Sequence, residues 1–351
     1  MNQQIRLSMA TIALLTLALS GCDAATDTAG MTESPSGSTS TSFPAPSDDS
    51  ITGFDSDITN NSLAVSPDEK TAVVSDSREK SLLIYDLVNG RLRERISGFV
   101  TPRNAAFIND GAQFVVSDSS LGTLRFYDTG DCKLQDEVVV GPGAFGTAVS
   151  PDQKTMYVNN QAHNSVTLVD LQLRKPIGVI TGFAQPRQGI KVSSDGSHVF
   201  VTNFVGDKVT VVDANSREIV RELTGFAKIR GISLTADGGT LYAANSGRNT
   251  ISVVDVRTGQ TTHDISVGQE PYGASLSPDG RLLFAGNKAD DSLDIIDTTT
   301  NTVTKTLKGF TEPRQAIVFS RDQDRAYVLN RDLSIARVSV ADLAVTGTIH
   351  Q

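Results

Sequence analysis

Several residue types on which catalytic and cofactor sites depend are scarce in this sequence. Its 351 residues contain no tryptophan, four histidines and two cysteines. Without a CxxCH motif the chain cannot attach a c-type haem, and four scattered histidines argue against a multi-histidine copper centre. GxSxG, HExxH and a glycine-rich phosphate loop are missing as well. These absences favour a protein without catalytic activity, without a cofactor and without a resident metal.

Long apolar runs are also missing, apart from one short run near the N-terminus. Residues 12–19 are apolar but too few to span a bilayer as a helix, and Arg6 gives the segment before them a positive charge. The run ends in Leu-Ser-Gly-Cys, which closes at Cys22 and resembles the lipobox of bacterial lipoproteins. The resemblance implies that residues 1–21 are a signal peptide and that Cys22 becomes the acylated N-terminus, carrying palmitate or a similar chain. The alternative is an ordinary secretory signal that contains a cysteine.

Residues 22–50 consist mainly of Ser, Thr, Ala and Pro and offer almost nothing that a core could bury, which is the composition of a disordered tether. As a flexible coil this segment spans roughly 30 Å. Several acyl chains on Cys22 would hold the protein at the bilayer, since each buried methylene contributes about 0.8 kcal/mol. Asp23 resembles the inner-membrane retention signal of enteric-type bacteria. We therefore expect a lipid-anchored protein of the bacterial cell envelope, on the periplasmic side of the inner membrane in preference to the outer membrane.

The charge balance narrows the range of molecules that the protein is suited to bind, and the second cysteine bears on disulfide formation. The formal net charge is -9, and removal of the signal peptide with Arg6 makes it -10. This balance argues weakly against non-specific nucleic-acid binding, although an average can conceal a polarised surface. With Cys22 acylated, Cys132 has no disulfide partner in the chain. We expect Cys132, in a turn between two outer strands, to be an exposed thiol that is either inert or open to intermolecular oxidation.

Acidic and amide side chains recur along the chain at intervals of 42 or 43 residues. One set closes apolar runs such as VTVVD and comprises Asp86, Asp128, Asp170, Asp213, Asp255 and Asp297, with Ser339 in the seventh place. A second set closes the preceding runs and comprises Asp76, Asp118, Asn160, Asn203, Asn245, Asn287 and Asn330. A third set lies in tight turns such as SPDG and comprises Asp68, Asp110, Asp152, Asp195, Asp237, Asp279 and Asp322. Three sets in register indicate seven copies of one repeat.

Each repeat has room for four short strands. Small residues dominate the first strand, and Asp and Asn suit the turns because their side chains bond the nearby backbone. No stretch between residues 51 and 351 has helical periodicity. We therefore predict an all-β fold, a seven-bladed β-propeller over residues 51–351 with four antiparallel strands per blade, present as a monomer.

The repeat motifs also resemble a known family. Strand endings such as YVNN and FVTN, the SPDG turn and the VVD strand are similar to the YVTN family of β-propeller repeats, and the similarity covers all seven repeats. The resemblance implies the fold. It implies no single function, because the roles proposed for members range from surface attachment to nucleic-acid or cofactor binding.

Closure of the ring is expected to involve residues that precede the first repeat. A Gly-Phe pair marks the junction between an outer strand and the next inner strand at five places, and the first pair, Gly53-Phe54, comes before any outer strand. The residues just before it therefore match the tail of an outer strand. We predict that residues 47–52 lie beside the last blade and help to close the ring.

Arginine recurs in four of the seven repeats at the entrance to the inner strand. These residues are Arg103, Arg187, Arg230 and Arg314. Their position predicts that they point toward the mouth of the central channel. Phe204 and Tyr272 are expected to offer aromatic surfaces beside them. Phe145 could do the same, although packing between blades explains it more simply. His163 is expected on the same face, by default as a solvated loop residue.

Like charges so close together need anionic partners. Glu312, Asp118 and Asp207 could supply them internally and so connect the blades. The arginines could instead bind an anionic ligand, because the planar guanidinium matches carboxylate and phosphate oxygens. The amides of the second recurrent set occur in blade after blade, which is better explained by capping of turns than by a ring of metal ligands.

Taken together, these features favour a membrane-anchored, non-enzymatic binding or scaffold propeller. Its arginine-rich channel mouth would engage an anionic small molecule, a nucleic acid or an acidic segment of another envelope protein. The alternative is a propeller hydrolase similar to lactonases, or a propeller subunit of a redox enzyme.

Overall fold

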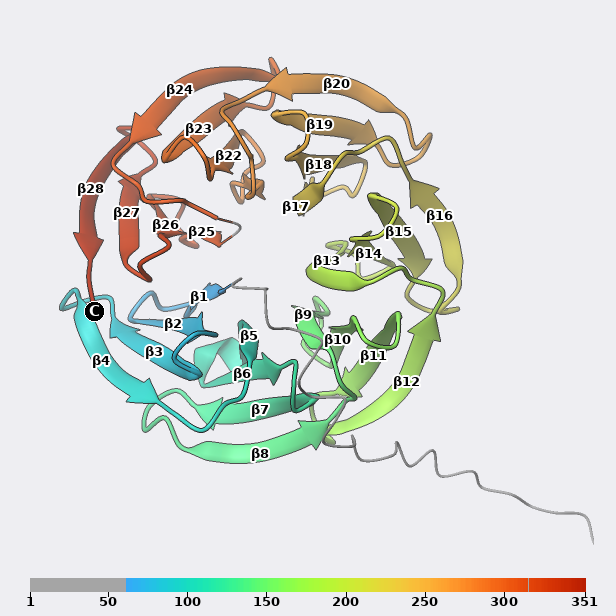
Figure 1. The fold of residues 1–351 in the computed structure, drawn as a ribbon, viewed down its shortest axis with the longest axis vertical. Helices are drawn as coiled ribbons and strands as arrows, with labels where there is room; N and C mark the ends of the chain where they lie inside the picture. The colour runs from blue at the N-terminus through green and yellow to red at the C-terminus, as the bar shows by residue number, and fades with distance from the viewer. Residues whose placement is uncertain (1–60, 315) are drawn as a thin grey trace, which may run out of the picture. The chain divides into compact units, whose positions relative to one another are not determined.

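The computed structural model describes residues 61–314 and 316–351. The predicted signal peptide, Cys22, the tether and residues 47–52 lie outside these residues and stay predictions. Over the described residues the chain forms seven four-stranded antiparallel sheets, arranged as blades around a central axis (Figure 1). The predicted seven-bladed β-propeller is confirmed.

Each blade uses four strands that are consecutive in the sequence. Blade 1 contains β1 (Leu63–Val65), β2 (Thr71–Asp76), β3 (Ser81–Asp86) and β4 (Arg91–Ile96). Blade 2 contains β5 (Pro102–Ile108), β6 (Gln113–Asp118), β7 (Thr123–Asp128) and β8 (Leu134–Val139). Blade 3 contains β9 (Ala144–Val149), β10 (Thr155–Asn160), β11 (Ser165–Asp170) and β12 (Lys175–Thr181). Blade 4 contains β13 (Pro186–Val192), β14 (His198–Asn203), β15 (Lys208–Asp213) and β16 (Ile219–Leu223).

The remaining blades follow the same scheme. Blade 5 contains β17 (Ile229–Leu234), β18 (Thr240–Asn245), β19 (Thr250–Asp255) and β20 (Thr261–Ser266). Blade 6 contains β21 (Ser275–Leu276), β22 (Leu282–Asn287), β23 (Ser292–Asp297) and β24 (Thr302–Lys308). Blade 7 contains β25 (Ile317–Phe319), β26 (Arg325–Leu329), β27 (Ile335–Ser339) and β28 (Ala344–Ile349). A 3-10 helix at Asn109–Gly111 takes the place of the first turn of blade 2.

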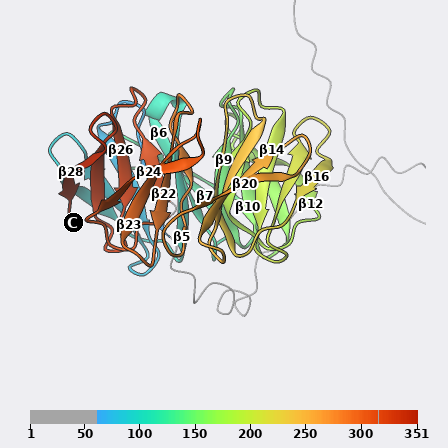
Figure 2. The ribbon, with the colours of Figure 1, turned by 90° about the horizontal axis from the view of Figure 1, so that it is seen from above.

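The strands of each blade pair in sequence order, so that every blade runs from an inner strand a to an outer strand d (Figure 1). Viewed from the side, the strands run between two faces of the ring (Figure 2). One face carries the d–a and b–c loops, and we call it the loop face. The opposite face carries the a–b and c–d turns, and we call it the turn face. No helix in the described part of the chain is long and apolar enough to cross a bilayer.

The apolar core lies between the blades. Strands b such as β2 are buried along their whole length, because a neighbouring blade covers each side. Seven apolar clusters result, and each joins side chains of two adjacent blades. Burial of one large apolar side chain contributes about 1.5–3 kcal/mol. Every blade therefore depends on both of its neighbours for stability.

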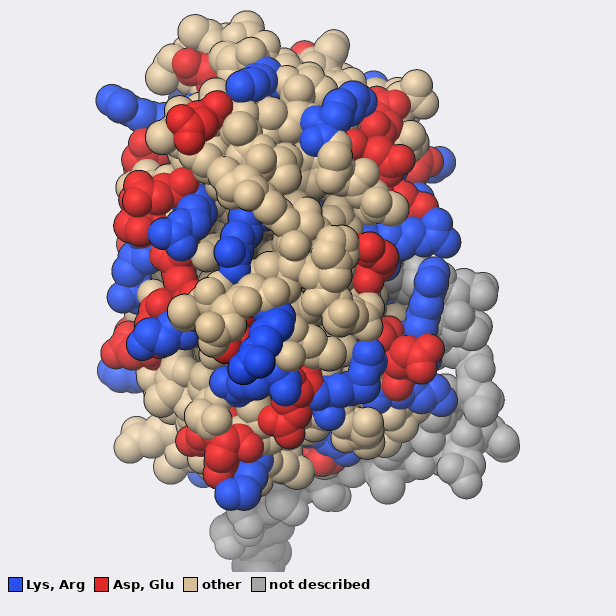
Figure 3. Space-filling model, turned by 90° about the vertical axis from the view of Figure 1, so that its left-hand side faces the viewer, with Lys and Arg blue, Asp and Glu red and all other residues tan. Residues whose placement is uncertain are grey.

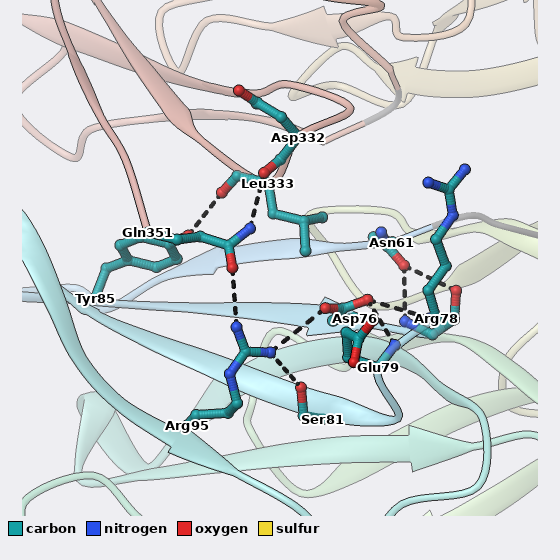
Figure 4. A network of polar contacts seen from close by, with 11 residues as sticks. Asn61, Asp76, Arg78, Glu79, Ser81, Tyr85, Arg95, Asp332, Leu333 and Gln351 are labelled. Carbon is teal, nitrogen blue, oxygen red and sulfur yellow. Dashed lines mark hydrogen bonds and ion pairs between the residues drawn. The ribbon is translucent and has the colours of Figure 1, made fainter.

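Blades 7 and 1 close the ring through an apolar cluster and a polar network beside it (Figure 4). The Tyr85 hydroxyl donates to the carbonyl oxygen of Leu333 at 2.8 Å. The Gln351 side chain donates to the carbonyl oxygen of Asp332 at 2.9 Å and accepts from Arg95, also at 2.9 Å. Side chains from both ends of the repeat array thus hold the seam together.

The recurrent aspartates of the turn face, apart from Asp110 in the 3-10 helix, serve as turn caps. In c–d turns the carboxylate accepts from backbone N–H groups that follow it, as Asp213 does from Asn215 at 3.0 Å and Ser216 at 2.8 Å. In a–b turns a hydroxyl two residues earlier donates to the carboxylate, as Ser193 does to Asp195 at 2.6 Å. Short polar side chains that bond the local backbone explain why these positions recur.

From these turn carboxylates we predict that the fold loses stability as the pH falls into the acid range. Hydrogen bonds lower the pKa of Asp195 to about 2, and the one from the Ser193 hydroxyl has the largest effect. Hydroxyl donors likewise lower the pKa of the equivalent residues Asp68, Asp152, Asp237, Asp279 and Asp322. A carboxylate with a lower pKa in the folded chain stabilises the fold above its unfolded pKa, and this contribution disappears as the pH falls through the folded pKa. We expect the melting temperature, followed by circular dichroism, to fall between about pH 4 and pH 2.

Ser193→Ala provides the control for this dependence. It removes the main donor to Asp195 and should make the acid dependence shallower. A melting temperature that stays constant from pH 5 to pH 2 would show that these carboxylates titrate alike in the folded and unfolded chains.

Cys132 differs from the predicted exposed thiol. Its side chain is 7% exposed and packs into the apolar cluster between blades 1 and 2. Burial raises the pKa of the Cys132 thiol, while Arg93, whose guanidinium lies 2.7 Å from the sulfur, opposes the shift. The prediction was wrong because the sequence places the turn on the outer part of the blade but does not show that the turn folds its thiol inward. Intermolecular oxidation is correspondingly disfavoured.

Candidate functional site

The d–a loops that carry the arginines are built alike in four blades. Each begins with a glycine at φ between +95° and +99°, and these glycines are Gly98, Gly182, Gly225 and Gly309. An L residue is strained in that conformation, which explains glycine at this point. A phenylalanine that is 5–7% exposed follows in each loop, and these residues are Phe99, Phe183, Phe226 and Phe310. The buried ring fixes the loop to the core between two blades.

The end of strand b holds the middle of the same loop. The Asn203 side-chain oxygen accepts from the backbone N–H of Ala184 at 2.7 Å, and Asn245 accepts from Ala227 at the same distance. In blade 2, Asp118 holds the loop in the same way, because its carboxylate accepts from the backbone N–H groups of Val100 and Thr101. With the contact from the Thr311 N–H to Asn330 at 3.0 Å, these contacts identify four members of the second recurrent set as caps of d–a loops. Among the described residues, no group of three or more His, Cys, Asp or Glu side chains could hold a metal ion.

Three residues after the capped position, the chain reaches the arginine. Arg103 lies in β5, Arg187 in β13 and Arg230 in β17, while Arg314 comes just before β25. The glycine, the buried ring and the cap together fix where each inner strand starts. All four side chains therefore originate at the loop face, around the channel, as their spacing predicts.

Two of the arginines form a continuous row with aromatic rings across blades 4 to 6. The Arg187 guanidinium carbon lies 3.5 Å from the centre of the Phe204 ring. The guanidinium carbon of Arg230 lies 5.4 Å from the same ring and 5.3 Å from the Tyr272 ring. We call Arg187, Phe204, Arg230 and Tyr272 the arginine–aromatic row. Phe204 is 39% exposed, so part of the row is open to solvent.

A glutamine that the sequence analysis did not single out extends this row into blade 3. With its amide oxygen turned toward Arg187, Gln161 accepts from Nε at 2.8 Å and from Nη2 at 3.1 Å. Gln161 is 4% exposed and lies in the b–c loop of blade 3. In the sequence, Gln161 stands out only because it departs from the repeat consensus. That departure does not indicate which residue its side chain contacts.

Arg103 is placed differently from the other three arginines. It is completely buried, and its guanidinium carbon lies 4.6 Å from the centre of the equally buried Phe145 ring. Its Nε also donates to the Ser119 hydroxyl at 3.1 Å. Arg103 was expected at an open channel mouth, but Phe145 and Ser119 hold it inside the protein. Phe145 takes the packing role that was its simpler explanation.

Arg314 lies apart from the row, in a pocket of about 190 Å³ between blades 7 and 1. Its Nη2 pairs with Glu312 at 3.4 Å, and Arg331 pairs with the same carboxylate. Glu312 is thus one predicted internal partner that the structure brings to its arginine. Arg78 lines the same pocket, and Figure 4 shows it on the blade 1 side of the seam.

The other two predicted internal partners pair with none of the described arginines. Asp118 caps the d–a loop of its own blade, and Asp207 accepts from the backbone N–H of Ile229 at 3.1 Å. Both carboxylates bond the backbone because the loops need acceptors there. Among the described residues, the guanidinium of Arg230 forms no ion pair with a carboxylate, and its one hydrogen bond goes to the carbonyl oxygen of Ile229 at 3.2 Å. His163 is exposed in the b–c loop of blade 3, as expected for a solvated loop residue.

The outer wall around blades 7 and 1 contrasts with the loop face. Lysine and arginine side chains lie there among aspartate and glutamate side chains, with uncharged surface between them (Figure 3). Charges of one sign do not gather on this wall. An exposed ion pair, such as that of Lys70 with Asp68 at 3.3 Å, contributes little to stability, about 0–1 kcal/mol.

Comparisons with known proteins agree with this architecture. The family model described as YNCE-like beta-propeller matches residues 122–237 and 224–338. No curated protein matches the sequence. Among solved structures, a chain of hydrazine synthase from Kuenenia stuttgartiensis is similar, with a TM-score of 0.70 and 18% sequence identity, over 86% of this chain and 98% of that chain. At this identity the similarity shows the fold alone.

Proposed function

Because this chain belongs to the YNCE-like β-propeller family, described by its fold and not by a reaction, we propose that it is a non-enzymatic binding or scaffold protein. Its loop face binds an anionic ligand, either a small molecule or nucleic acid, or an acidic segment of another envelope protein. The repeat motifs support a propeller of the YVTN type. The ligand lies on the arginine–aromatic row.

The observation that carries this proposal is the environment of Arg230. Its guanidinium lies against two aromatic rings, those of Phe204 and Tyr272, and no described carboxylate neutralises it. Aromatic faces stabilise a guanidinium by about 0.5–2 kcal/mol and leave its N–H edges free to donate. Those edges match planar carboxylate and phosphate oxygens. The partly exposed Phe204 ring adds a surface on which a base or another flat anion can stack.

A thermal-shift screen of the full-length protein tests the proposal. The probes are sugar phosphates, nucleotides, short single-stranded oligonucleotides and citrate, each compared with chloride at equal ionic strength. A probe at 100 times its dissociation constant stabilises the fold by about 2.7 kcal/mol. We expect at least one probe to raise the melting temperature of the wild type, and the double variant R187A/R230A to lose that shift.

Arg257→Ala is the matched control, since Arg257 is exposed in the c–d turn of blade 5 on the opposite face from Arg230. It should keep the full shift. Phe204→Leu separates stacking from charge, because it should weaken nucleotides and oligonucleotides but not sugar phosphates. Protection that survives in R187A/R230A would mean that the row is structural and would overturn the proposal.

The proposed location is the cell envelope, with the propeller held at a membrane by the acylated Cys22. Support comes from the order of the charged, apolar and Leu-Ser-Gly-Cys segments in the sequence. Cys22→Ala should move the protein from the membrane to the soluble fraction and remove the acyl mass from its N-terminal peptide. Membrane association that is unchanged in this variant would reject the lipid anchor.

The alternative is a lactonase-like hydrolase or a propeller subunit of a redox enzyme. The solved structure that is similar in fold carries the name of an enzyme, hydrazine synthase. Metal analysis and lactone turnover of the purified protein, together with the spectrum of any co-purifying redox cofactor, separate this alternative from the binding function.

A further inference from the structure

The central channel holds a polar cavity that is separate from the arginine–aromatic row. Its volume is about 200 Å³, and inner strands of several blades line it. The lining includes the side chains of Asn104, Thr147, Gln188 and Lys191. A water molecule in liquid occupies about 30 Å³, so the cavity is large enough for a small organic acid.

Among the residues that the structure describes, Lys191 is the one charged residue in this lining. It belongs to β13, and its side chain is exposed within the channel. No ion pair or hydrogen bond of its ammonium group occurs within the described part of the chain. Desolvation lowers the pKa of Lys191. A cation without a counter-ion in such a place is costly, and an anion that enters the channel relieves the cost.

Other polar side chains of the lining are held in place by one another. Gln188 donates to the Asn104 side-chain oxygen at 2.7 Å, and Asn104 donates to the Thr147 hydroxyl oxygen at 2.8 Å. This chain of contacts links blades 4, 2 and 3 across one side of the channel. The Thr147 oxygen accepts, so its own proton can be donated into the cavity. The site thus presents one cation and one neutral donor.

We propose that Lys191 and Thr147 bind the carboxylate of a small polar acid inside the channel. The single ammonium group matches one carboxylate, and a cavity of about 200 Å³ has room for a small acid. The amide groups of Asn104 and Gln188 make the lining suitable for a hydroxyl-bearing acid. This site goes beyond the proposed function and does not depend on it.

Sodium lactate is the probe that tests the channel site. In thermal-shift and calorimetric titrations, lactate should stabilise the wild type relative to sodium chloride at equal ionic strength. Lys191→Met keeps the length of the side chain but removes its charge, so it should lose the lactate effect. In sodium chloride the melting temperature of this variant should equal or exceed that of the wild type, because the variant no longer carries a desolvated cation. Thr147→Val should weaken lactate binding several-fold.

Two controls make the test specific. Lys154→Met changes a lysine that is 80% exposed on the turn face and should keep the lactate effect. The double variant R187A/R230A should also keep it, which separates a failure of this site from a failure of the arginine–aromatic row. An equal lactate shift in the wild type and Lys191→Met would overturn the proposal, and so would the absence of any shift in the wild type. A Lys191→Met protein that melts well below the wild type in chloride would assign the lysine a structural role instead.

Discussion

Gly146→Ala should lower the melting temperature by roughly 5–10 °C, which corresponds to about 2–3 kcal/mol of stability. Gly146 lies in β9, where the inner strands of blades 3 and 4 approach closely. A Cβ atom added at this position would lie 2.6 Å from the carbonyl oxygen of Arg187 and closer still to that of Gln188. Both are backbone atoms of β13, so no side chain can turn aside. The two inner strands would have to separate.

Circular dichroism melts and urea unfolding measure this effect. Gly347→Ala is the matched control, because Gly347 is also in a strand but an added Cβ would meet nothing within 4 Å. That variant should stay within about 0.5 kcal/mol of the wild type. Since the displaced backbone carries Arg187, Gly146→Ala should also weaken anion binding on the loop face. A Gly146→Ala protein as stable as Gly347→Ala would mean that the blades can spread without cost.

Asn203→Leu should destabilise the fold by about 3 kcal/mol. Asn203 is completely buried; its oxygen accepts from the N–H of Ala184 and its nitrogen donates to the Thr210 hydroxyl at 2.9 Å. Leucine fills the space but leaves these two groups without their partner. The loop between Gly182 and Arg187 would lose its cap. We therefore expect a lower melting temperature together with weaker binding of any anion that depends on Arg187.

Asn203→Asp is the informative comparison, because Asp118 caps the equivalent loop of blade 2 with its carboxylate. The aspartate can still accept from Ala184, and Thr210 can donate to it. Its loss of stability should be smaller than that of Asn203→Leu. Equal losses in the two variants would show that packing of the side chain matters here and that the cap does not.

Much of the fold follows from residues that repeat. Asp86 and its equivalents mark the ends of strands c, and the structure places each of them there. The capping role of Asn203 follows in the same way, because an amide at one place in blade after blade indicates a requirement of the backbone. The start of strand a at Arg187 and Arg230 could be predicted from the preceding Gly-Phe pair. Local chemistry determined all of these positions.

Features that depend on contact between blades could not be predicted. Arg103 has the same sequence context as Arg187, yet Phe145 of the next blade covers it. Cys132 turns inward and packs into the core between blades 1 and 2. One feature of the sequence distinguishes Lys191, because it is the only charged residue at its position in strand a among the seven repeats. The sequence does not show, however, that this position lines the channel, which becomes clear only from the assembled ring.

The shared apolar clusters have a consequence for how the ring comes apart. No blade has an apolar core of its own, because each apolar cluster is shared by two adjacent blades. Removal of any one blade would therefore expose part of two clusters at once and uncover one side of each neighbouring blade. A solenoid with free ends can fray one repeat at a time. A closed ring has no such end, and partial unfolding exposes nearly as much apolar surface as opening the whole circle. Limited proteolysis should therefore leave intact rings and short peptides, with no stable six-blade fragment between them.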